Sequence, residues 1–213
     1  KNNLTVCNDA ATATAGAGWS ASASNYEALF TKIATSCAGG KAPDLVYLAG
    51  IFDNNGGQLV KDKVKVLGPN TGTGAVKFMM PDGFTGYPDF LALKEAQGAY
   101  LSFTGLSIDQ FPKGGAAEKF QAAYLKEYKV APTSSFSVYG AAAAQVILDA
   151  IARSNGTRKD VFAKMKTVDI PATKSVVGTR LKFDDGGDIM SKDITILTVT
   201  NSTETFLKKI TLK

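Results

Sequence analysis

The chain has 213 residues, of which 45% are hydrophobic and 20% charged, and its formal net charge is +5. This composition is typical of a folded globular protein with a sizeable core, and it excludes disordered, collagen-like and coiled-coil chains. Histidine is absent, which excludes Ser-His-Asp and Cys-His catalysis and every metal site that uses histidine. The basic side chains are scattered among acidic ones rather than gathered in a stripe, so we expect no nucleic-acid partner.

The first half of the chain alternates apolar runs with amphipathic stretches. A short β-like run at residues 4–7 precedes a segment rich in Gly, Ala and Ser at residues 10–24, which predicts a loop. Apolar residues at helical spacing predict a helix over residues 25–37, and the continuous apolar run at residues 44–49 predicts a buried parallel strand. The pattern then predicts a short helix over 55–63, a strand over 76–80, a helix over 89–97 and a strand over 99–104. This alternation indicates an α/β fold with a parallel sheet.

The second half begins with helices and ends with strands. Helical spacing predicts helices over residues 113–128, 137–153 and 158–165, and the pattern turns to strands over 179–183, 193–200 and 205–212. The longest apolar run, residues 138–148, is interrupted by Gly140 and Gln145 and is too short to span a bilayer. The residues that follow Lys1 predict no signal peptide within the given sequence, and a leader removed earlier stays open.

Two loops follow predicted parallel strands, at the edge of the sheet where open α/β folds bind their ligands. Asp82 lies directly after the strand over residues 76–80, where its carboxylate can either receive an ammonium group or hydrogen-bond its own turn. The loop from Gly50 to Asn55 occupies the equivalent place after the preceding strand. Its Phe52 either lines an apolar pocket or packs beneath the loop.

Other candidate sites have simpler interpretations. The acidic segment Asp184 to Asp188 lacks the ligand spacing of a calcium loop and predicts a turn between strands. Trp19 either stacks on a ligand or anchors the Gly/Ala-rich loop to its own domain. Cys7 and Cys37 are the only cysteines, and composition alone leaves open a disulfide or two buried thiols. No nucleophile with a base, no metal site and no cofactor site is recognised, so we expect no enzyme and no cofactor.

The order of segments resembles the carboxyl-terminal part of the type I periplasmic solute-binding proteins of ABC importers, in particular the branched-chain amino-acid (Leu/Ile/Val) binding family. Each motif is short, but six occur in the family's order along nearly the whole chain. Examples are Pro43-Asp-Leu-Val-Tyr47, which is similar to the family's "PD-x-V-Y" strand, and Met80-Pro-Asp-Gly83, which is similar to its "G-P-E-G" loop. The other motifs lie at residues 25–33, 95–100, 120–151 and 178–188.

This resemblance implies a two-lobed α/β protein of which the present chain is roughly the last three-fifths, the amino-terminal lobe being largely missing. Residues 1–105, joined by 185–213, are expected to form most of the second lobe, and residues 106–184 a helical segment of the first lobe. The chain is expected to cross between lobes near residues 104–108 and 178–184.

The resemblance also implies a function, which is the capture of an amino acid or similar small polar solute between two lobes and its delivery to an ABC permease. The implied ligand-binding residues are Asp82, Gly83, Phe84, Ile51 and Phe52. Asp82 is expected to bind the ligand's ammonium group, and Gly83 is expected to let the ligand approach because it lacks a Cβ.

The implied location is periplasmic or extracellular. One form of this location is attachment to the membrane by a lipid anchor on a missing amino-terminal segment. Such a setting favours a disulfide between Cys7 and Cys37. Two other functions remain as alternatives. One is the extracellular ligand-binding domain of a sensor or receptor, which needs a transmembrane or signalling segment beyond Lys213. The other is an amide hydrolase, which needs a nucleophile that the sequence does not reveal.

Overall fold

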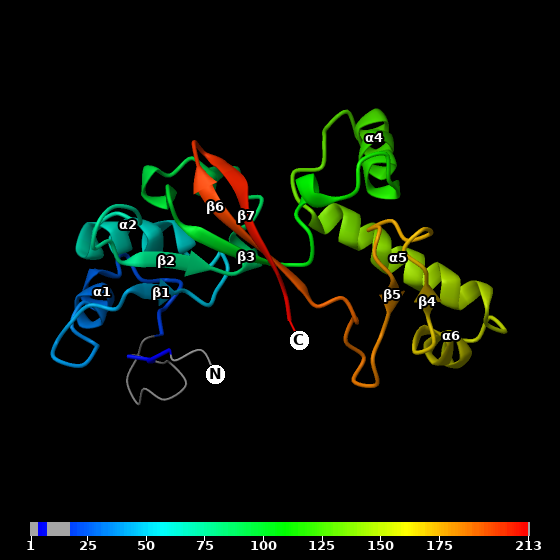
Figure 1. Cartoon of the computed structure of the whole chain (residues 1–213), viewed down its shortest axis with the longest axis horizontal. Coiled ribbons are helices and arrows are strands. Elements are labelled where there is room, and N and C mark those ends of the chain that lie inside the picture. The colour runs from blue at the N-terminus through cyan, green and yellow to red at the C-terminus, as the bar shows by residue number, and fades with distance from the viewer. Residues whose placement is uncertain (1–3, 8–17, 213) are drawn as a thin grey trace. The chain divides into compact units, whose positions relative to one another are not determined.

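In the computed structural model of the chain, residues 4–7 and 18–212 are described, and the chain divides into two compact units (Figure 1). Unit 1 comprises Lys1–Phe103 and Ile196–Lys208, and unit 2 comprises Thr104–Thr195 and Lys209–Lys213. The chain returns to unit 1 at Ile196, and the division into lobes at residues 105 and 185 stays a prediction. The predicted crossing near residues 178–184 lies inside unit 2.

A five-stranded sheet has the order β1-β2-β3-β6-β7. Its strands are β1 (Leu45–Tyr47), β2 (Lys77–Met80), β3 (Tyr100–Thr104), β6 (Asp193–Thr200) and β7 (Thr203–Thr211). β1 pairs in parallel with β2, and β2 pairs in parallel with β3. β6 runs the opposite way, because the N–H of Val199 donates to the carbonyl of Ala99 and the N–H of Gly105 donates to that of Asp193. The sheet thus has a parallel part followed by an antiparallel part, and it confirms the α/β fold class.

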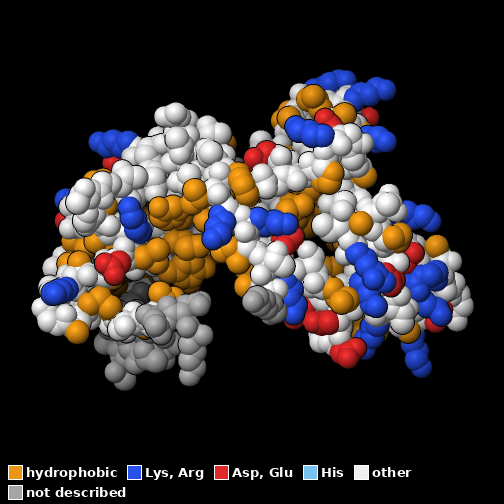
Figure 2. Space-filling view, in the orientation of Figure 1, with side chains coloured by type: hydrophobic (Ala, Val, Ile, Leu, Met, Phe, Trp, Pro, Cys, Tyr) orange, Lys and Arg blue, Asp and Glu red, His pale blue; other side chains and the backbone are white. Residues whose placement is uncertain are grey.

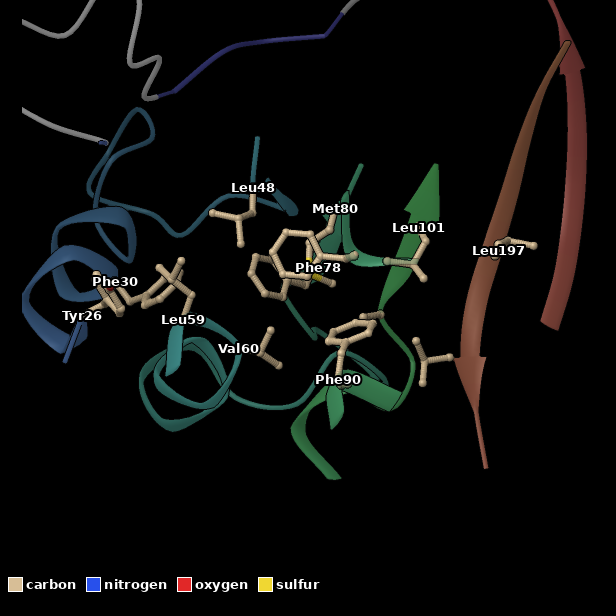
Figure 3. Packing of buried hydrophobic residues seen from close by; sticks show 14 of the residues in the cluster. Tyr26, Phe30, Leu48, Leu59, Val60, Phe78, Met80, Phe90, Leu101 and Leu197 are labelled. Atoms are coloured by element: carbon tan, nitrogen blue, oxygen red, sulfur yellow. The ribbon is translucent and has the colours of Figure 1, made fainter. Parts of the chain in front are cut away.

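Helices cover one face of the parallel strands in unit 1. They are α1 (Glu27–Ile33), α2 (Gly56–Leu67) and the short α3 (Pro88–Leu91), with 3-10 turns η1 (Asp82–Phe84) and η2 (Lys94–Ala96). Figure 3 shows side chains of α1 and α2 pointing toward those of β2, β3 and β6. The labelled residues are all buried: Tyr26, Phe30, Leu48, Leu59, Val60, Phe78, Met80, Phe90, Leu101 and Leu197.

A buried polar network joins α2 to the segment that precedes β2. The side chain of Lys63 is fully buried and donates hydrogen bonds from Nζ to Asn70 Oδ1 at 2.7 Å and to the carbonyl oxygens of Val76 at 2.6 Å and Gly68 at 3.0 Å. Asn70 in turn donates to the carbonyls of Glu95 and Gln97. Every polar atom of this network therefore has a partner, as burial requires.

Unit 2 is built from three longer helices and a two-stranded antiparallel ribbon. The helices are α4 (Ala116–Tyr128), α5 (Phe136–Ala152) and α6 (Arg158–Met165), after the 3-10 turn η3 (Ile108–Gln110), and the ribbon is β4 (Asp169–Ile170) with β5 (Leu181–Lys182). One face of α5 contributes buried residues to the core of the unit: Val138, Ala142, Val146 and Ala150. Ile147, Leu148 and Ile151 on α5 remain exposed.

The structure corrects several predicted elements. Residues 4–7 form no strand, and Leu4 and Val6 are 86% and 71% exposed. The run at residues 44–49 is a parallel strand as predicted, but it forms the edge of the sheet and its Leu45 and Tyr47 side chains are exposed rather than buried.

Helix lengths also differ from the prediction. The helix expected over residues 55–63 continues to Leu67, because Val64 and Val66 extend its apolar pattern. The helix expected over residues 89–97 is two short turns, and the break at Leu93 has extended backbone angles. A loop was expected over residues 10–24. Residues 10–17 lie outside the described residues, and residues 18–24 contain neither helix nor strand.

A disulfide joins Cys7 to Cys37, as the resemblance led us to expect. Cys37 lies shortly after α1, where its N–H donates to the carbonyl of Lys41. The bond therefore ties residues 4–7 to the end of the first helix, across a sequence separation of 30.

Candidate functional site

The loops after β1 and β2 lie against each other at the carboxyl ends of these parallel strands. The N–H of Leu48 donates to the carbonyl of Met79 at 2.9 Å, and the N–H of Phe52 donates to the carbonyl of Gly83 at 3.0 Å. The two loops that the sequence singled out are thus in direct contact. The fold brings together all five residues predicted to bind a ligand.

Gly83 is required by this contact between the loops. A Cβ at residue 83 would lie 2.6 Å from Cγ2 of Ile51 and 3.0 Å from the carbonyl oxygen of Gly50. A side chain there would force the loops apart. The space beside Gly83 is therefore occupied by Ile51, whereas the sequence had led us to expect a ligand to approach at this point.

Four aromatic rings pack beneath the loops. Phe52 lies 4.9 Å from Tyr87, 5.9 Å from Phe90 and 6.2 Å from Phe84, measured between ring centroids. Phe84 is fully buried and contacts Phe90 edge to face at 5.6 Å. Of the two interpretations of Phe52, packing beneath the loop is the one that these contacts favour. Phe84 lies in the core, and its contact with a ligand stays a prediction.

Asp82 has a side chain that the turn itself does not use. The N–H and Oγ1 of Thr85 both donate to the backbone carbonyl of Asp82, at 2.9 and 2.8 Å. Among the described residues, none donates a hydrogen bond to the Asp82 carboxylate or forms an ion pair with it. Asp82 is half-buried, and Ile51 on the neighbouring loop is 45% exposed. The pair offers one negative charge beside an apolar side chain.

Contacts from distant parts of unit 1 hold the first loop in place. Trp19 donates from Nε1 to the carbonyl of Asn54 at 3.2 Å, and its ring fills the space where a Cβ of Gly50 would be. Tyr87 donates its hydroxyl hydrogen to Asp53 Oδ2 at 2.7 Å, and this bond to a carboxylate raises the pKa of Tyr87 above its ordinary value. Trp19 is thus an anchor of the loop, the second of its two predicted roles.

The second loop is tied to β7. The N–H of Gly86 donates to Oε1 of Glu204 at 2.6 Å. The two residues lie 118 positions apart, so no local pattern in the sequence could have revealed this contact.

Three surface hollows lie away from these loops. Hollows of about 680 and 380 Å³ occur in unit 2 beside α5, and one of about 630 Å³ lies along α2 in unit 1. None of the three is lined by Ile51, Phe52 or residues 82–84. Within residues 4–7 and 18–212, no group of histidine, cysteine and acidic side chains could hold a metal ion. No helix of the described chain is long and apolar enough to cross a membrane.

Comparison with known proteins shows the fold. No family model matches the chain, and neither does any curated protein sequence. Among solved structures, the leucine-binding protein LivK of Thermotoga maritima matches with a TM-score of 0.70 and 18% identity over 89% of this chain. A solute-binding protein from R. palustris in complex with benzoate matches with a TM-score of 0.62 and 18% identity over 86% of this chain. An ABC transporter substrate-binding protein from Desulfitobacterium hafniense in complex with Leu matches with a TM-score of 0.58 and 16% identity over 77% of this chain.

The chain spans about half the length of each of these proteins, with shares of 49%, 46% and 43%. It therefore has the fold of the corresponding half of an ABC-transporter substrate-binding protein.

Proposed function

We propose that the chain is part of a solute-binding protein of an ABC importer and that its ligand is an amino acid. The observation that carries this proposal is the Asp82 carboxylate, which no described residue uses and which lies in a loop at the carboxyl end of a parallel strand. Ligands of open α/β sheets bind at that edge. The structural similarity to substrate-binding proteins supports the same class of function.

In this proposal Asp82 accepts a charge-assisted hydrogen bond from the ligand's ammonium group. The exposed side chain of Ile51 gives the ligand an apolar surface. The other predicted residues hold the two loops in place. Gly83 lets the loops touch, and the rings of Phe52 and Phe84 pack beneath them. The attraction between carboxylate and ammonium strengthens when a closing lobe excludes water, because the local dielectric constant falls.

Ligand chemistry separates amino acids from simple carboxylic acids. One structural neighbour was solved with Leu and another with benzoate, and both ligands carry a carboxylate on an apolar body. Only the amino acid has an ammonium group that could pair with Asp82. A ligand that has a carboxylate but no ammonium group gains no binding energy from Asp82. We therefore expect an amino acid to bind in preference to benzoate.

We also propose that unit 1 belongs to one lobe of the binding protein and unit 2 to the other. Unit 1 corresponds to the predicted second lobe, and unit 2 contains the helical segment assigned to the first. The chain passes between the units after Phe103, before Ile196 and after Lys208. Motion of one lobe about such connecting segments is the usual way in which binding proteins enclose a solute. Delivery of the enclosed solute to a membrane permease would follow.

The disulfide supports a location outside the cytosol. Cys7 and Cys37 are joined, and structural disulfides persist in oxidising compartments such as the periplasm or the cell exterior. A solute-binding protein of an importer works in the same compartments.

Isothermal titration calorimetry tests the proposal on the natural polypeptide that contains this sequence. The titrants are leucine, 4-methylpentanoate, which is leucine without its ammonium group, and benzoate, followed by the other amino acids. We expect saturable one-to-one binding of an amino acid and much weaker binding of its analogue without the ammonium group. Binding of benzoate or 4-methylpentanoate as tight as that of every amino acid would contradict the role of Asp82. Saturable hydrolysis of amides would favour the enzyme alternative instead.

A further inference from the structure

The loop that carries Asp82 is anchored at its far end by a carboxylate from a distant part of the chain. The loop begins where β2 ends, at Met80, and leads to α3, which begins at Pro88. Near its end the N–H of Gly86 donates to Oε1 of Glu204 at 2.6 Å. A hydrogen bond to a carboxylate is stronger than one to a neutral acceptor. Glu204 therefore holds this end of the loop more firmly than a backbone carbonyl would.

Two short hydrogen bonds lead from this anchor back to Asp82. Thr85, the neighbour of Gly86, is buried, and its N–H and Oγ1 donate to the carbonyl of Asp82 at 2.9 and 2.8 Å. Gly86 itself has a φ of +76°, a left-handed conformation that glycine adopts without strain. A movement of Gly86 away from Glu204 carries Thr85 with it, and Thr85 is bonded to Asp82. The position of Asp82 is thereby linked to the bond between Gly86 and Glu204.

Glu204 is itself held in place. It is the second residue of β7, it is half-buried, and it follows a turn in which Asn201 and Ser202 both have positive φ. The N–H of Ser202 donates to Oε1 of Gln97 at 3.3 Å. Gln97 in turn donates from Nε2 to backbone carbonyls at and just after the end of α3. The tip of the hairpin is thus fixed to unit 1, and Glu204 offers the loop an anchor with a defined position.

We propose that Glu204 is a positioning residue for ligand binding, which holds Gly86 and so fixes the place from which Asp82 binds the ligand's ammonium group. The proposal rests on the function proposed above for Asp82, and it adds a residue that acts without touching the ligand. A loop that is already fixed loses little conformational freedom when a ligand binds. The anchor at Glu204 therefore raises the affinity of Asp82 for its ligand.

A direct effect of the Glu204 charge on a cationic ligand is the main alternative. Figure 2 shows mainly hydrophobic side chains over the part of unit 1 that carries β1 and β2. Charges interact more strongly beside apolar surroundings than in bulk water. A second carboxylate near the loop after β2 would then attract an ammonium group by itself, without any effect on the position of Asp82.

Two substitutions separate positioning from direct attraction. Glu204→Gln keeps the length of the side chain and its accepting oxygen but removes the charge. Glu204→Asp keeps the charge but is one methylene shorter, which withdraws the carboxylate from the N–H of Gly86. Positioning requires the length, whereas direct attraction requires the charge. The two explanations therefore predict opposite rankings of the two variants.

Calorimetry on the natural polypeptide that contains this sequence is the first experiment. The probe is leucine, or the amino acid that binds most tightly if leucine does not bind. We expect Glu204→Asp to weaken binding roughly 10-fold and Glu204→Gln to stay within about 3-fold of the parent. Glu118 accepts a hydrogen bond from the N–H of Gly114 in unit 2, a contact of the same kind that shares no residue with the loop. Glu118→Asp is therefore the matched control and should leave the affinity unchanged.

A double-mutant cycle shows whether Glu204 acts through Asp82. In the Asp82→Asn background, Glu204→Asp should weaken binding by less than about 2-fold, because the charge that it positions is gone. A loss as large as in the parent background would overturn the proposal, and so would tight binding by Glu204→Asp together with weak binding by Glu204→Gln. If Asp82→Asn lowers the affinity and Glu204→Asp does not, positioning alone fails. If Asp82→Asn has no effect, the proposed function of Asp82 fails and positioning fails with it.

Hydrogen exchange without any ligand gives an independent measurement. The N–H of Thr85, which donates to the carbonyl of Asp82, should exchange about 10-fold faster in Glu204→Asp than in the parent, because the loop opens more often. Its exchange in Glu204→Gln and in Glu118→Asp should stay close to that of the parent. Unchanged exchange of Thr85 in Glu204→Asp would overturn the proposal, whichever amino acid binds.

Discussion

Replacing Lys63 with methionine perturbs the buried network of unit 1 at its centre. Lys63 donates to Gly68, Asn70 and Val76 from a fully buried position. Methionine retains much of the shape but leaves three buried oxygens without this donor, and a hydrogen bond from a charged donor contributes about 1.5–3 kcal/mol. Methionine carries no charge, so the cost of burying the Lys63 ammonium disappears, and this gain offsets a part of the loss. We expect Lys63→Met to lower the free energy of unfolding by about 2–3 kcal/mol at pH 7.

The pH dependence of stability gives a sharper signature of the same residue. Burial, with a smaller contribution from the charge of Lys77, lowers the pKa of Lys63 from 10.5 to about 8. Below pH 8 the lysine is charged in both states, and its burial penalty is fully present. Between about pH 8 and 10.5 the folded protein releases this proton while the unfolded chain retains it, so the stability rises with pH. The difference between 10.5 and about 8 corresponds to a rise of at most about 3 kcal/mol in the free energy of unfolding.

Urea unfolding at several values between pH 7 and 10 measures this contribution. Trp19 is the only tryptophan, and its fluorescence reports on unit 1. Lys61→Met, an exposed lysine of the same helix, is the matched control. The parent and the control should share the rise contributed by Lys63, whereas Lys63→Met should lack it. An identical pH dependence in all three proteins would refute the reasoning.

Two further substitutions test the disulfide and the contact between the loops. Cys37→Ser removes the bond to Cys7 across a separation of 30, and loop entropy predicts a loss of about 3–4 kcal/mol in the free energy of unfolding; an unchanged urea midpoint would contradict this. Gly83→Ala places a Cβ 2.6 Å from Cγ2 of Ile51, and we expect a loss of about 1–3 kcal/mol. Gly140→Ala is its control, because a Cβ there meets nothing within 4 Å in a helix and alanine should be neutral or stabilising; a thermal melt that ranks the two variants in reverse would show that the loops tolerate separation.

Elements with strong local signals could be predicted to the residue. The helix predicted over residues 158–165 is α6, where the Oγ1 of Thr157 accepts a hydrogen bond from the N–H of Asp160 and fixes the start. The strand predicted over residues 193–200 is β6, in which Thr195, Leu197 and Val199 alternate as buried residues. Capping and strict alternation are properties of neighbouring residues, so the sequence reveals them.

Features that depend on partners elsewhere in the fold could not be predicted. An apolar run is the same whether its strand is central or at an edge, so the exposure of Leu45 and Tyr47 was not foreseen. The loops of the candidate site were predicted from their places after parallel strands, but their anchors at Trp19 and Glu204 come from distant segments. The burial of Phe84 depends on the surrounding aromatic rings and likewise has no local signal.

The most direct test of the proposed function is the affinity of the natural polypeptide and its Asp82→Asn variant for the amino acid that binds the parent. Asparagine keeps the shape of the side chain and removes its charge. Calorimetry should show a loss of about 1.5–3 kcal/mol in binding free energy, the worth of one hydrogen bond to a charged group. Asp89→Asn, an exposed residue of α3, should leave the affinity unchanged. Equal affinity of the parent and Asp82→Asn would contradict the proposal that this carboxylate holds an ammonium group.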